Sequence, residues 1–112
     1  MRSKPLTVLV AYRPRKGKER RLLALVRRHW PALDALGLVT GPPARIWRAR
    51  DKRTGRVHFV EMFTWRDAAA SDLAHRTPEV MAIWGPMESV LEDLELASVE
   101  PVPPGARRAR RR

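Results

Sequence analysis

The spacing of apolar residues changes along the chain in an order that few folds can accommodate. Leu6–Tyr12 is rich in β-branched residues and apolar at both odd and even positions, which is typical of a strand covered on both faces. A helical stripe follows, formed by Leu22, Val26, Trp30, Leu33 and Leu36. Their steps of three and four residues predict one buried face of an amphipathic helix that ends at Gly37.

Two further strands are predicted on either side of a short turn. The strands cover Ala44–Arg50 and Arg56–Trp65, and Asp51–Gly55 connects them. An Asp-to-Gly turn between β-branched and aromatic residues is typical of a hairpin. Thr40–Pro43, which precedes the first of these strands, is expected to be a rigid loop.

The helical period then returns twice. Asp67 is expected to cap a short alanine-rich helix that runs to about His75, and Thr77–Pro78 starts another helix with proline at its first position. The apolar stripe of this second helix comprises Val80, Ile83, Trp84, Met87, Leu91 and Leu94. Leu94–Val102 is the last strand candidate, and its start overlaps the predicted helix end.

The resulting order is strand, helix, strand, strand, helix, strand. This order predicts an α+β, ferredoxin-like βαββαβ fold, in which a four-stranded antiparallel sheet carries its helices on one face. The other face of the sheet also carries apolar residues and is expected to meet a partner. Residues 1–102 form the predicted domain, and residues 103–112 form an arginine-rich tail that is expected to be disordered because it has no sizeable apolar side chain.

Composition excludes several kinds of site. The sequence has no cysteine, so disulfides, thiolate metal ligands and thiol catalysis are all excluded. The three histidines show no metal-ligand spacing, and we expect neither a metal nor another cofactor. No apolar run approaches the ~20 residues of a membrane span, and no signal peptide opens the chain. The expected location is therefore the cytoplasm, without a membrane partner.

One carboxylate stands out in the third strand. The period of two places Glu61 in one row with Val57, Phe59, Phe63 and Trp65. Burying a carboxylate costs several kcal/mol unless it is paired, hydrogen-bonded or protonated. Two interpretations remain open. Glu61 is either an acid, base or hydrogen-bond acceptor in a pocket, or a structural residue that pairs with one of the many arginines or lies on a partly exposed strand.

Two aromatic side chains in the helical region are also ambiguous. His75 ends the first short helix, and an imidazole can exchange a proton near neutral pH. Histidines at helix ends also bind free backbone carbonyls, so a structural role is equally compatible with the sequence. Trp84 is compatible with a pocket wall or with the core.

The positive charge is concentrated in the first half of the chain. Residues 1–56 carry 16 basic and 3 acidic side chains, whereas residues 57–100 carry 2 basic and 9 acidic ones. The predicted hairpin contributes Arg48, Arg50, Lys52, Arg53 and Arg56. These side chains could attract phosphates of a nucleic acid, or they could form a solvated loop. The stacking aromatics of an RNA-recognition motif are missing, since Met62 and Thr7 occupy their positions.

The segment from the third strand onward resembles a known family. Its residues are Phe59-Val60-Glu61-Met62-Phe63-Thr64-Trp65, Asp67 with the alanine-rich helix, His75-Arg76-Thr77-Pro78-Glu79-Val80, and Ile83-Trp84. This segment is similar to the antibiotic-biosynthesis-monooxygenase-like proteins of the dimeric α+β barrel superfamily. With the opening strand and first helix, the resemblance covers about residues 6–102.

The resemblance implies a fold, an assembly and a site. Two ferredoxin-like protomers would pack sheet to sheet as a homodimeric α+β barrel, with a pocket between sheet and helices in each. Characterised oxygenases of the family act on phenols or quinols of polycyclic aromatics with O₂ and without metal or flavin. Glu61 and His75 match the family's strand glutamate and helix histidine. The haem-degrading branch is disfavoured, because the first strand has no asparagine and Trp84 occupies the position of the haem ligand.

Together these observations predict a homodimer that binds a small apolar or aromatic molecule. Whether it is an enzyme stays open, and the candidate activity is that of a cofactor-independent monooxygenase. Glu61 or His75 would take the substrate's proton, and Phe63, Trp65 and Trp84 would wall the pocket. One alternative is a non-catalytic module whose basic hairpin and tail bind nucleic acid or an acidic partner. A barrel with a purely ligand-binding or structural role is the other.

Overall fold

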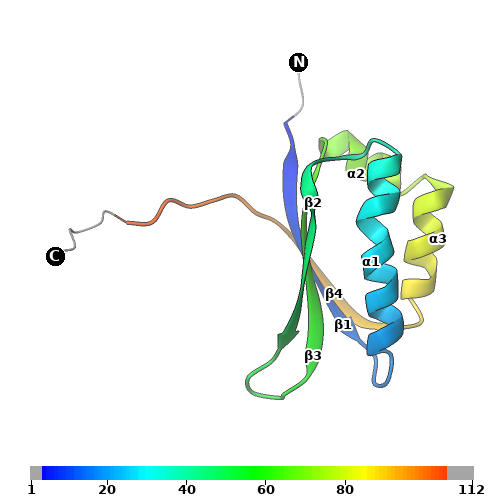
Figure 1. Cartoon of the computed structure of the whole chain (residues 1–112), viewed down its shortest axis with the longest axis vertical. Coiled ribbons are helices and arrows are strands. Elements are labelled where there is room, and N and C mark those ends of the chain that lie inside the picture. The colour runs from blue at the N-terminus through cyan, green and yellow to red at the C-terminus, as the bar shows by residue number, and fades with distance from the viewer. Residues whose placement is uncertain (1–3, 106–112) are drawn as a thin grey trace.

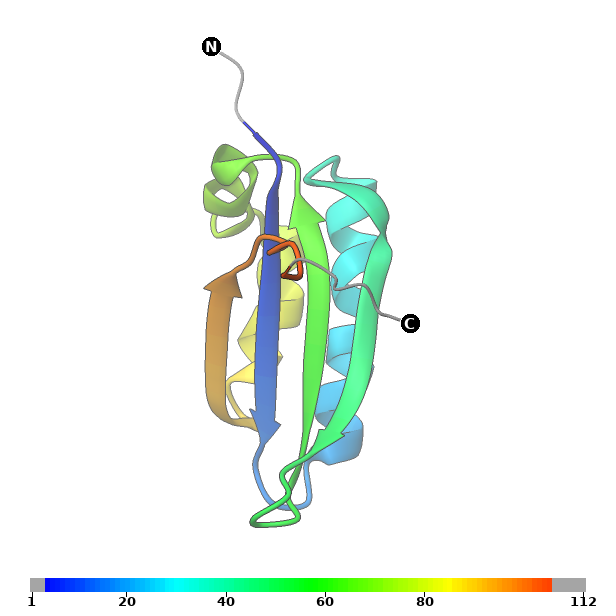
Figure 2. The same ribbon diagram turned by 90° about the vertical axis from the view of Figure 1, so that its left-hand side faces the viewer.

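The computed structural model describes residues 4–105 and contains a single sheet with helices on one side. The elements in chain order are β1 (Leu6–Pro14), α1 (Glu19–Ala35), β2 (Val39–Arg50), β3 (Val57–Trp65), α2 (Ala68–Ala74), α3 (Pro78–Met87) and β4 (Leu91–Ser98). All neighbouring strands are antiparallel, in the order β2-β3-β1-β4. The predicted ferredoxin-like arrangement is therefore confirmed (Figures 1 and 2).

The core lies between the helices and one face of the sheet. On the sheet side it is formed by alternate residues of the two central strands, Val8, Val10, Tyr12, Phe59, Phe63 and Trp65. The helices contribute the buried side chains Leu22, Val26, Leu33, Val80, Ile83 and Met87. The period-two row predicted for β3 is thus the buried row, and Glu61 lies at its centre, opposite Val10 in the register.

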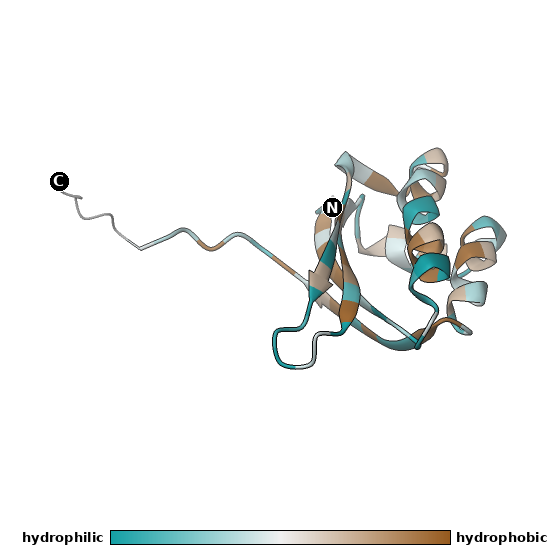
Figure 3. Ribbon diagram, turned by 60° about the horizontal axis from the view of Figure 1, so that its bottom comes forward, coloured by the Kyte–Doolittle hydropathy of each residue, from teal (hydrophilic) through white to brown (hydrophobic). Residues whose placement is uncertain are grey.

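The helix cap and the hairpin turn that the sequence predicts are both present in the structure. The Asp67 side chain accepts a hydrogen bond from the N–H of Ala70 at 2.8 Å and so caps α2. In the hairpin, Asp51 Oδ1 accepts from the N–H groups of Arg53 and Thr54, and Gly55 takes a positive φ of 76°. The loop between β2 and β3 is hydrophilic (Figure 3).

The predicted loop at Thr40–Pro43 is instead part of β2, which begins at Val39. Thr40 pairs with Thr64 and Arg45 with Met62, so that residues 41–44 bulge out opposite a single residue of β3. Prolines 42 and 43 fit there because β2 is an edge strand, where a missing N–H breaks no ladder on the open side.

The boundary between α3 and β4 also differs from the prediction. Leu91 and Leu94 belong to β4 and not to the helical stripe, because α3 ends at Met87. Val90 donates to the carbonyl of Met87 at 3.0 Å, which tightens the chain into a turn, and Leu91 then pairs with Pro14 of β1. Met87 and Leu91 are four residues apart, as on one face of a helix, although a turn separates them. The apolar pattern alone therefore did not reveal where α3 ends.

The chain leaves the sheet after β4. The strand ends at Ser98, earlier than the predicted Val102. Residues 100–105 have no regular secondary structure and project from the face opposite the helices (Figures 1 and 3). Most of the predicted tail, residues 106–112, lies outside the described residues. Between residues 4 and 105, no helix has the length and apolarity needed to cross a membrane.

Candidate functional site

A cleft of about 660 Å³ opens between α3 and the β1–β4 side of the sheet. Its walls are mainly apolar and include Leu6, Val8, Val10, Met81, Leu94 and Leu96. The cleft is open at β4, where Leu96 remains 68% exposed. Polar groups come from Tyr12, His29, Ser71, His75, Trp84 and Glu88. An apolar cleft with a few polar groups is the usual form of a small-molecule site.

Behind this cleft lies a buried carboxylate with two donors. Glu61 is fully buried, and its Oε1 accepts a hydrogen bond from the Tyr12 hydroxyl at 2.6 Å. The same oxygen lies 3.0 Å from Nδ1 of His29, which is also buried. The other oxygen, Oε2, has no hydrogen-bond partner among the described residues. Two donors on one oxygen offset much of the cost of burying the carboxylate.

The hydrogen bonds assign the tautomer of His29. An indole N–H can only donate, and Nε1 of Trp84 lies 2.9 Å from Nε2 of His29. Nε2 is therefore the acceptor nitrogen, and Nδ1 carries the proton that is donated to Glu61. The chain of contacts Trp84–His29–Glu61–Tyr12 thus links the wall of the cleft to the centre of the sheet.

Tyr12 is held in its protonated form by its surroundings. Burial raises the pKa of its phenol well above the ordinary value, and the negative charge of Glu61 and the hydrogen bond to it act in the same direction. Tyr12 therefore remains a donor to Glu61 at neutral pH.

His75 occupies the rim of the cleft. It is exposed at the end of α2, and its Nδ1 lies 2.9 Å from the carbonyl oxygen of Ser71. Since a carbonyl only accepts, Nδ1 must carry a proton, and Nε2 is the acceptor nitrogen of the neutral ring. The Trp84 ring packs between two imidazoles, with centroid distances of 4.8 Å to His75 and 5.7 Å to His29.

The structure separates the two predicted proton acceptors. His75, Trp65 and Trp84 line the cleft, as the sequence predicts for pocket residues, but Glu61 and Phe63 do not. Phe63 instead packs edge-on against His29, with a centroid distance of 5.4 Å. Glu61 is fully buried and contacts Tyr12 and His29. It makes no hydrogen bond to an arginine of residues 4–105, so the alternatives of an arginine ion pair and of a partly exposed strand do not hold there.

Tyr12 and His29 are the polar residues of this site that sequence reasoning missed. The predicted stripe of α1 placed Trp30 on the buried face, whereas His29 is only 3% exposed. A signal was available, since His29 follows Leu22 by seven residues and Val26 by three. The proximity of Tyr12 to Glu61 depends on the pairing of β1 with β3, which no local pattern specifies.

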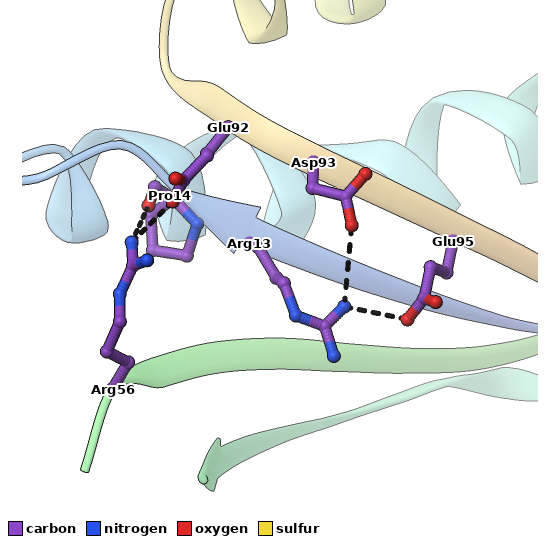
Figure 4. A network of polar contacts seen from close by, with 6 residues as sticks. All are labelled: Arg13, Pro14, Arg56, Glu92, Asp93 and Glu95. Atoms are coloured by element: carbon purple, nitrogen blue, oxygen red, sulfur yellow. Dashed lines mark hydrogen bonds and ion pairs between the residues drawn. The ribbon is translucent and has the colours of Figure 1, made fainter. Parts of the chain in front are cut away.

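The basic residues of the hairpin are distributed over different surfaces. Arg50 and Arg56 line a second groove of about 800 Å³, together with Arg15, Lys16 and Lys18. Arg56 also forms an ion pair with Glu92, while Arg13 pairs with Glu95 at 2.7 Å (Figure 4). Arg48 lies over the ring of Phe59 at 5.2 Å, and Lys52 and Arg53 belong to the turn.

Within residues 4–105, no three histidine, aspartate or glutamate side chains form a group that could hold a metal ion. The buried pair of His29 and Glu61 has no third such side chain beside it there. Every nitrogen of His29 is engaged by the surrounding protein. The site is therefore organised around hydrogen bonds and aromatic packing.

Comparison with known proteins finds similar folds among solved structures. No family model matches the sequence, and no curated protein matches it significantly. Solved structures do match over most of the chain. PA3566 from Pseudomonas aeruginosa is 18% identical with a TM-score of 0.67, covering 90% of this chain and 97% of its own. An antibiotic biosynthesis monooxygenase is 19% identical with a TM-score of 0.66, covering 88% and 99%.

A third structure has a stated activity. SnoaB, a cofactor-independent oxygenase from Streptomyces nogalater, is 13% identical with a TM-score of 0.64, covering 91% of this chain and 99% of its own. Identities this low establish similarity of fold and not of activity. The chain has the ferredoxin-like fold of the antibiotic-biosynthesis-monooxygenase-like proteins.

Proposed function

We propose that the protein is a homodimer whose cleft binds a small apolar or aromatic molecule. The observation that carries this proposal is the cleft itself, which is apolar over most of its wall and has Trp84 and His75 at one side. Aromatic side chains favour flat, apolar ligands through edge-to-face and offset contacts. The few polar groups would fix the orientation of one hydroxyl or carbonyl group of the ligand.

His75 is the group best suited to take a proton from such a ligand. Its Nδ1 is engaged by the Ser71 carbonyl, so its Nε2 is the basic nitrogen at the rim. Glu61 is fully buried, and its Oε1 is already shared by two donors. We assign Glu61 the role of positioning Tyr12 and His29 at the floor of the cleft. A proton would reach Glu61 only through one of these two donors.

The finer part of the proposal is a cofactor-independent oxygenation, the activity stated for SnoaB. A phenolate formed by proton transfer to His75 would raise the electron density of the ring toward O₂. For a polycyclic phenol with a ring CH₂, one oxygen atom becomes a carbonyl at that carbon. The other leaves as water with both hydrogens of the CH₂, so the substrate supplies all four electrons.

The homodimer is proposed from the face of the sheet that the helices leave open, which Figure 2 shows toward the viewer. The strand register places Leu9, Ala11, Trp47, Val60, Met62 and Ala97 on this outer face. Trp47 is 41% exposed there. The same register places the charged side chains of Arg13, Asp93 and Glu95 toward one end of this face. Two copies can bury its apolar part against each other around a two-fold axis, with the sheets stacked as in a sandwich.

Binding in the cleft is tested with 2-naphthol as the probe, followed through its own fluorescence. Leu96→Asp places a charge at the open side of the cleft, and Leu73→Asp is the matched control on an exposed position of α2 outside it. We expect Leu96→Asp to weaken binding at least tenfold and Leu73→Asp to leave it unchanged. Equal affinities in the two variants would refute the cleft as the site.

Turnover is tested separately by oxygen consumption with anthrone, a polycyclic substrate with a ring CH₂. We expect His75→Ala to reduce the rate at saturating anthrone by 10²-fold or more, the usual contribution of a proton-transfer group being roughly 10²–10⁴-fold. Binding of 2-naphthol should change little. Unaltered oxygen consumption in His75→Ala would exclude His75 as the base and leave the binding proposal standing.

A second candidate function rests on the basic groove. Arg15, Lys16 and Lys18 line it together with Arg50, and of its two acidic side chains Glu92 is already paired with Arg56. This excess of positive charge favours phosphate groups of a nucleic acid. The expected signature is binding of a single-stranded oligonucleotide that falls steeply with salt and weakens in Lys16→Glu. Undetectable binding at low salt would exclude this function.

A further inference from the structure

We infer that a hydroxyl group of the ligand binds at the floor of the cleft by entering the hydrogen bond between Trp84 and His29. The inference rests on the proposed function, since it uses the same cleft, and it adds to His75 at the rim a second acceptor at the floor. Both His29 and Trp84 line the cleft. The 2.9 Å bond from Nε1 of Trp84 to Nε2 of His29 thus joins two groups that border the space for the ligand.

The acceptor nitrogen of His29 is held in a fixed direction. On the other side of the ring, Nδ1 lies 3.0 Å from Oε1 of Glu61, and Phe63 packs edge-on with a centroid distance of 5.4 Å. A carboxylate that accepts from Nδ1 raises the electron density of the imidazole and strengthens the bonds that Nε2 accepts. Nε2 is therefore a pre-oriented acceptor that requires a donor, and the indole of Trp84 supplies one from within the chain.

A hydroxyl group fits between these two nitrogens because it both donates and accepts. The indole N–H of Trp84 then donates to the hydroxyl oxygen, and the O–H donates to Nε2 of His29. Two bonds of about 2.8 Å that meet at a roughly tetrahedral oxygen span roughly 4.6 Å. The two nitrogens would therefore move apart by only about 1.7 Å from their present 2.9 Å, and neither would lose its hydrogen bond.

Other substituents satisfy this position less well. A carbonyl or ether oxygen can accept from Trp84, but it has no proton for Nε2 of His29, which is only 3% exposed. A buried acceptor without a donor carries the full cost of its lost hydration. An apolar substituent makes neither bond. The pair of Trp84 and His29 therefore selects a hydroxyl group over a carbonyl, an ether or a hydrocarbon.

The end of α3 can accommodate the small displacement of Trp84. Pro86 lies inside this helix and has no N–H for the carbonyl one turn earlier, so the ladder of backbone bonds is interrupted there. Gly85, which also lines the cleft, has free space beside it, since an added Cβ would meet no heavy atom within 4 Å. The opening of the bond is thus opposed neither by a continuous helix ladder nor by a packed side chain at residue 85.

His29 and His75 would bind different parts of the ligand. The ring of Trp84 lies between the two imidazoles, with centroid distances of 5.7 Å to His29 and 4.8 Å to His75. A hydroxyl group bound at His29 is therefore separate from the group whose proton His75 would take. The ligand that this cleft favours is an aromatic compound with a hydroxyl group at the end that reaches the floor.

The test compares two probes of nearly the same shape, 2-naphthol and 2-fluoronaphthalene, of which only the first has an O–H. Equilibrium dialysis gives the dissociation constant of each, and their ratio is the preference for the hydroxyl group. Two variants break the same bond and serve as a matched pair. His29→Asn keeps a donor for Glu61 but removes Nε2, whereas Trp84→Phe keeps a flat ring and leaves Nε2 in place.

We expect His29→Asn to lower the preference for 2-naphthol by roughly tenfold, because the O–H loses its acceptor. Trp84→Phe should keep the preference at least as high as in the unaltered protein, since the acceptor remains. His75→Ala should leave it unchanged, because this ring lies at the rim. Circular dichroism confirms that each variant is folded.

The outcomes separate the hydroxyl position from the cleft. An equal preference in His29→Asn and Trp84→Phe overturns the inference and leaves binding in the cleft intact. A preference that is lost in His75→Ala instead places the hydroxyl group at the rim and also overturns it. If neither probe binds the unaltered protein, the inference and the proposed cleft fail together.

A measurement on the unaltered protein does not depend on the folding of a variant at residue 29. The ¹⁵N spectrum resolves the rings of the three histidines, and His58→Gln and His75→Ala assign the other two. We expect 2-naphthol to move the Nε2 resonance of His29 further than 2-fluoronaphthalene does, because only 2-naphthol replaces the indole N–H by an O–H donor. The two probes have similar ring currents, so equal shifts would contradict the inference.

Discussion

The indole N–H of Trp84 donates to Nε2 of His29 at 2.9 Å, across the interface between α3 and α1. This bond determines which nitrogen of the buried imidazole carries its proton, and therefore which nitrogen can donate to Glu61. A residue in the wall of the cleft thus controls the hydrogen bonding of a carboxylate at the centre of the sheet. Any ligand that moves Trp84 acts on Glu61 through His29.

Trp84→Phe should destabilise the protein by about 1–3 kcal/mol, because it leaves Nε2 of His29 buried without a donor. Urea unfolding measures the free energy, and Leu73→Ala on the exposed side of α2 is the control, with an expected change within ~0.5 kcal/mol. In the unaltered protein, the ¹⁵N spectrum of the ring should report the Nδ1–H tautomer. A Nε2–H tautomer would contradict the assigned network.

Tyr12 should resist ionisation until the protein unfolds. Its pKa is raised in the folded state, so above about pH 10 the unfolded chain loses a proton that the native chain retains. The free energy of unfolding should then decrease by about 1.4 kcal/mol per pH unit until the native pKa is reached, whereas below pH 10 this group adds no pH dependence. Tyr12→Phe should remove this contribution to the decrease in the free energy of unfolding above pH 10.

The measurement is direct because Tyr12 is the only tyrosine in the sequence. Ultraviolet absorbance of the phenolate therefore titrates one residue. The curve in urea should have its midpoint near the ordinary pKa of tyrosine, about 10. A native titration with the same midpoint would show that the phenol is not buried against Glu61.

Glu61→Leu should be more damaging than an ordinary core substitution. It removes the acceptor of both Tyr12 and His29 and leaves two buried donors without a partner, at roughly 1–3 kcal/mol for each. Tyr12→Phe in the Glu61→Leu background should recover part of the loss, because it removes one of these donors. Additive effects in this double-mutant cycle would argue against a shared network.

Met62→Glu should convert the protein to a monomer, because it places a charge at the centre of the outer face of the sheet. Met81→Glu is the matched control on the helical side, where the side chain is already 43% exposed. Light scattering should give a mass near twice 12.9 kDa for the control and near 12.9 kDa for Met62→Glu. A dimeric Met62→Glu protein would exclude this face as the interface.

Gly55→Ala should cost about 1–2 kcal/mol, because residue 55 adopts a φ of 76° that a Cβ disfavours. No neighbouring atom lies within 4 Å of an added Cβ, so the cost arises from the backbone alone. Gly55→Asn should cost less, since asparagine tolerates the left-handed region. Thermal unfolding compares the two variants, and equal losses would point to a different cause.

The fold was predictable from sequence because its signals are local and agree with one another. The period-two row of β3, the cap at Asp67 and the turn from Asp51 to Gly55 each depend on a few adjacent residues. The unusual position of Glu61, a carboxylate in a buried apolar row, also followed from the period of two in β3. The end of α3 was predicted wrongly, because Leu91 and Leu94 continue a helical spacing through a turn into β4.

The site was predicted less completely than the fold. His29 was overlooked because a helical stripe is recognised by its apolar residues. The adjacent Trp30 fitted the apolar spacing, although His29 is the more deeply buried of the two. The partners of Glu61 come from β1 and α1, 49 and 32 residues away in the chain. Such contacts follow from the strand register and from helix packing, which are properties of the whole fold.

The bulge in β2 bears on how this sheet behaves in a crowded solution. An exposed strand edge can template the addition of strands from other molecules, which is the first step toward fibres. At residues 41–44 the strand bends out of register, and two adjacent prolines offer no N–H to an incoming strand. The longest strand of the protein therefore lacks a continuous edge for indefinite strand addition, and the sheet can associate through its face without being extended along this edge.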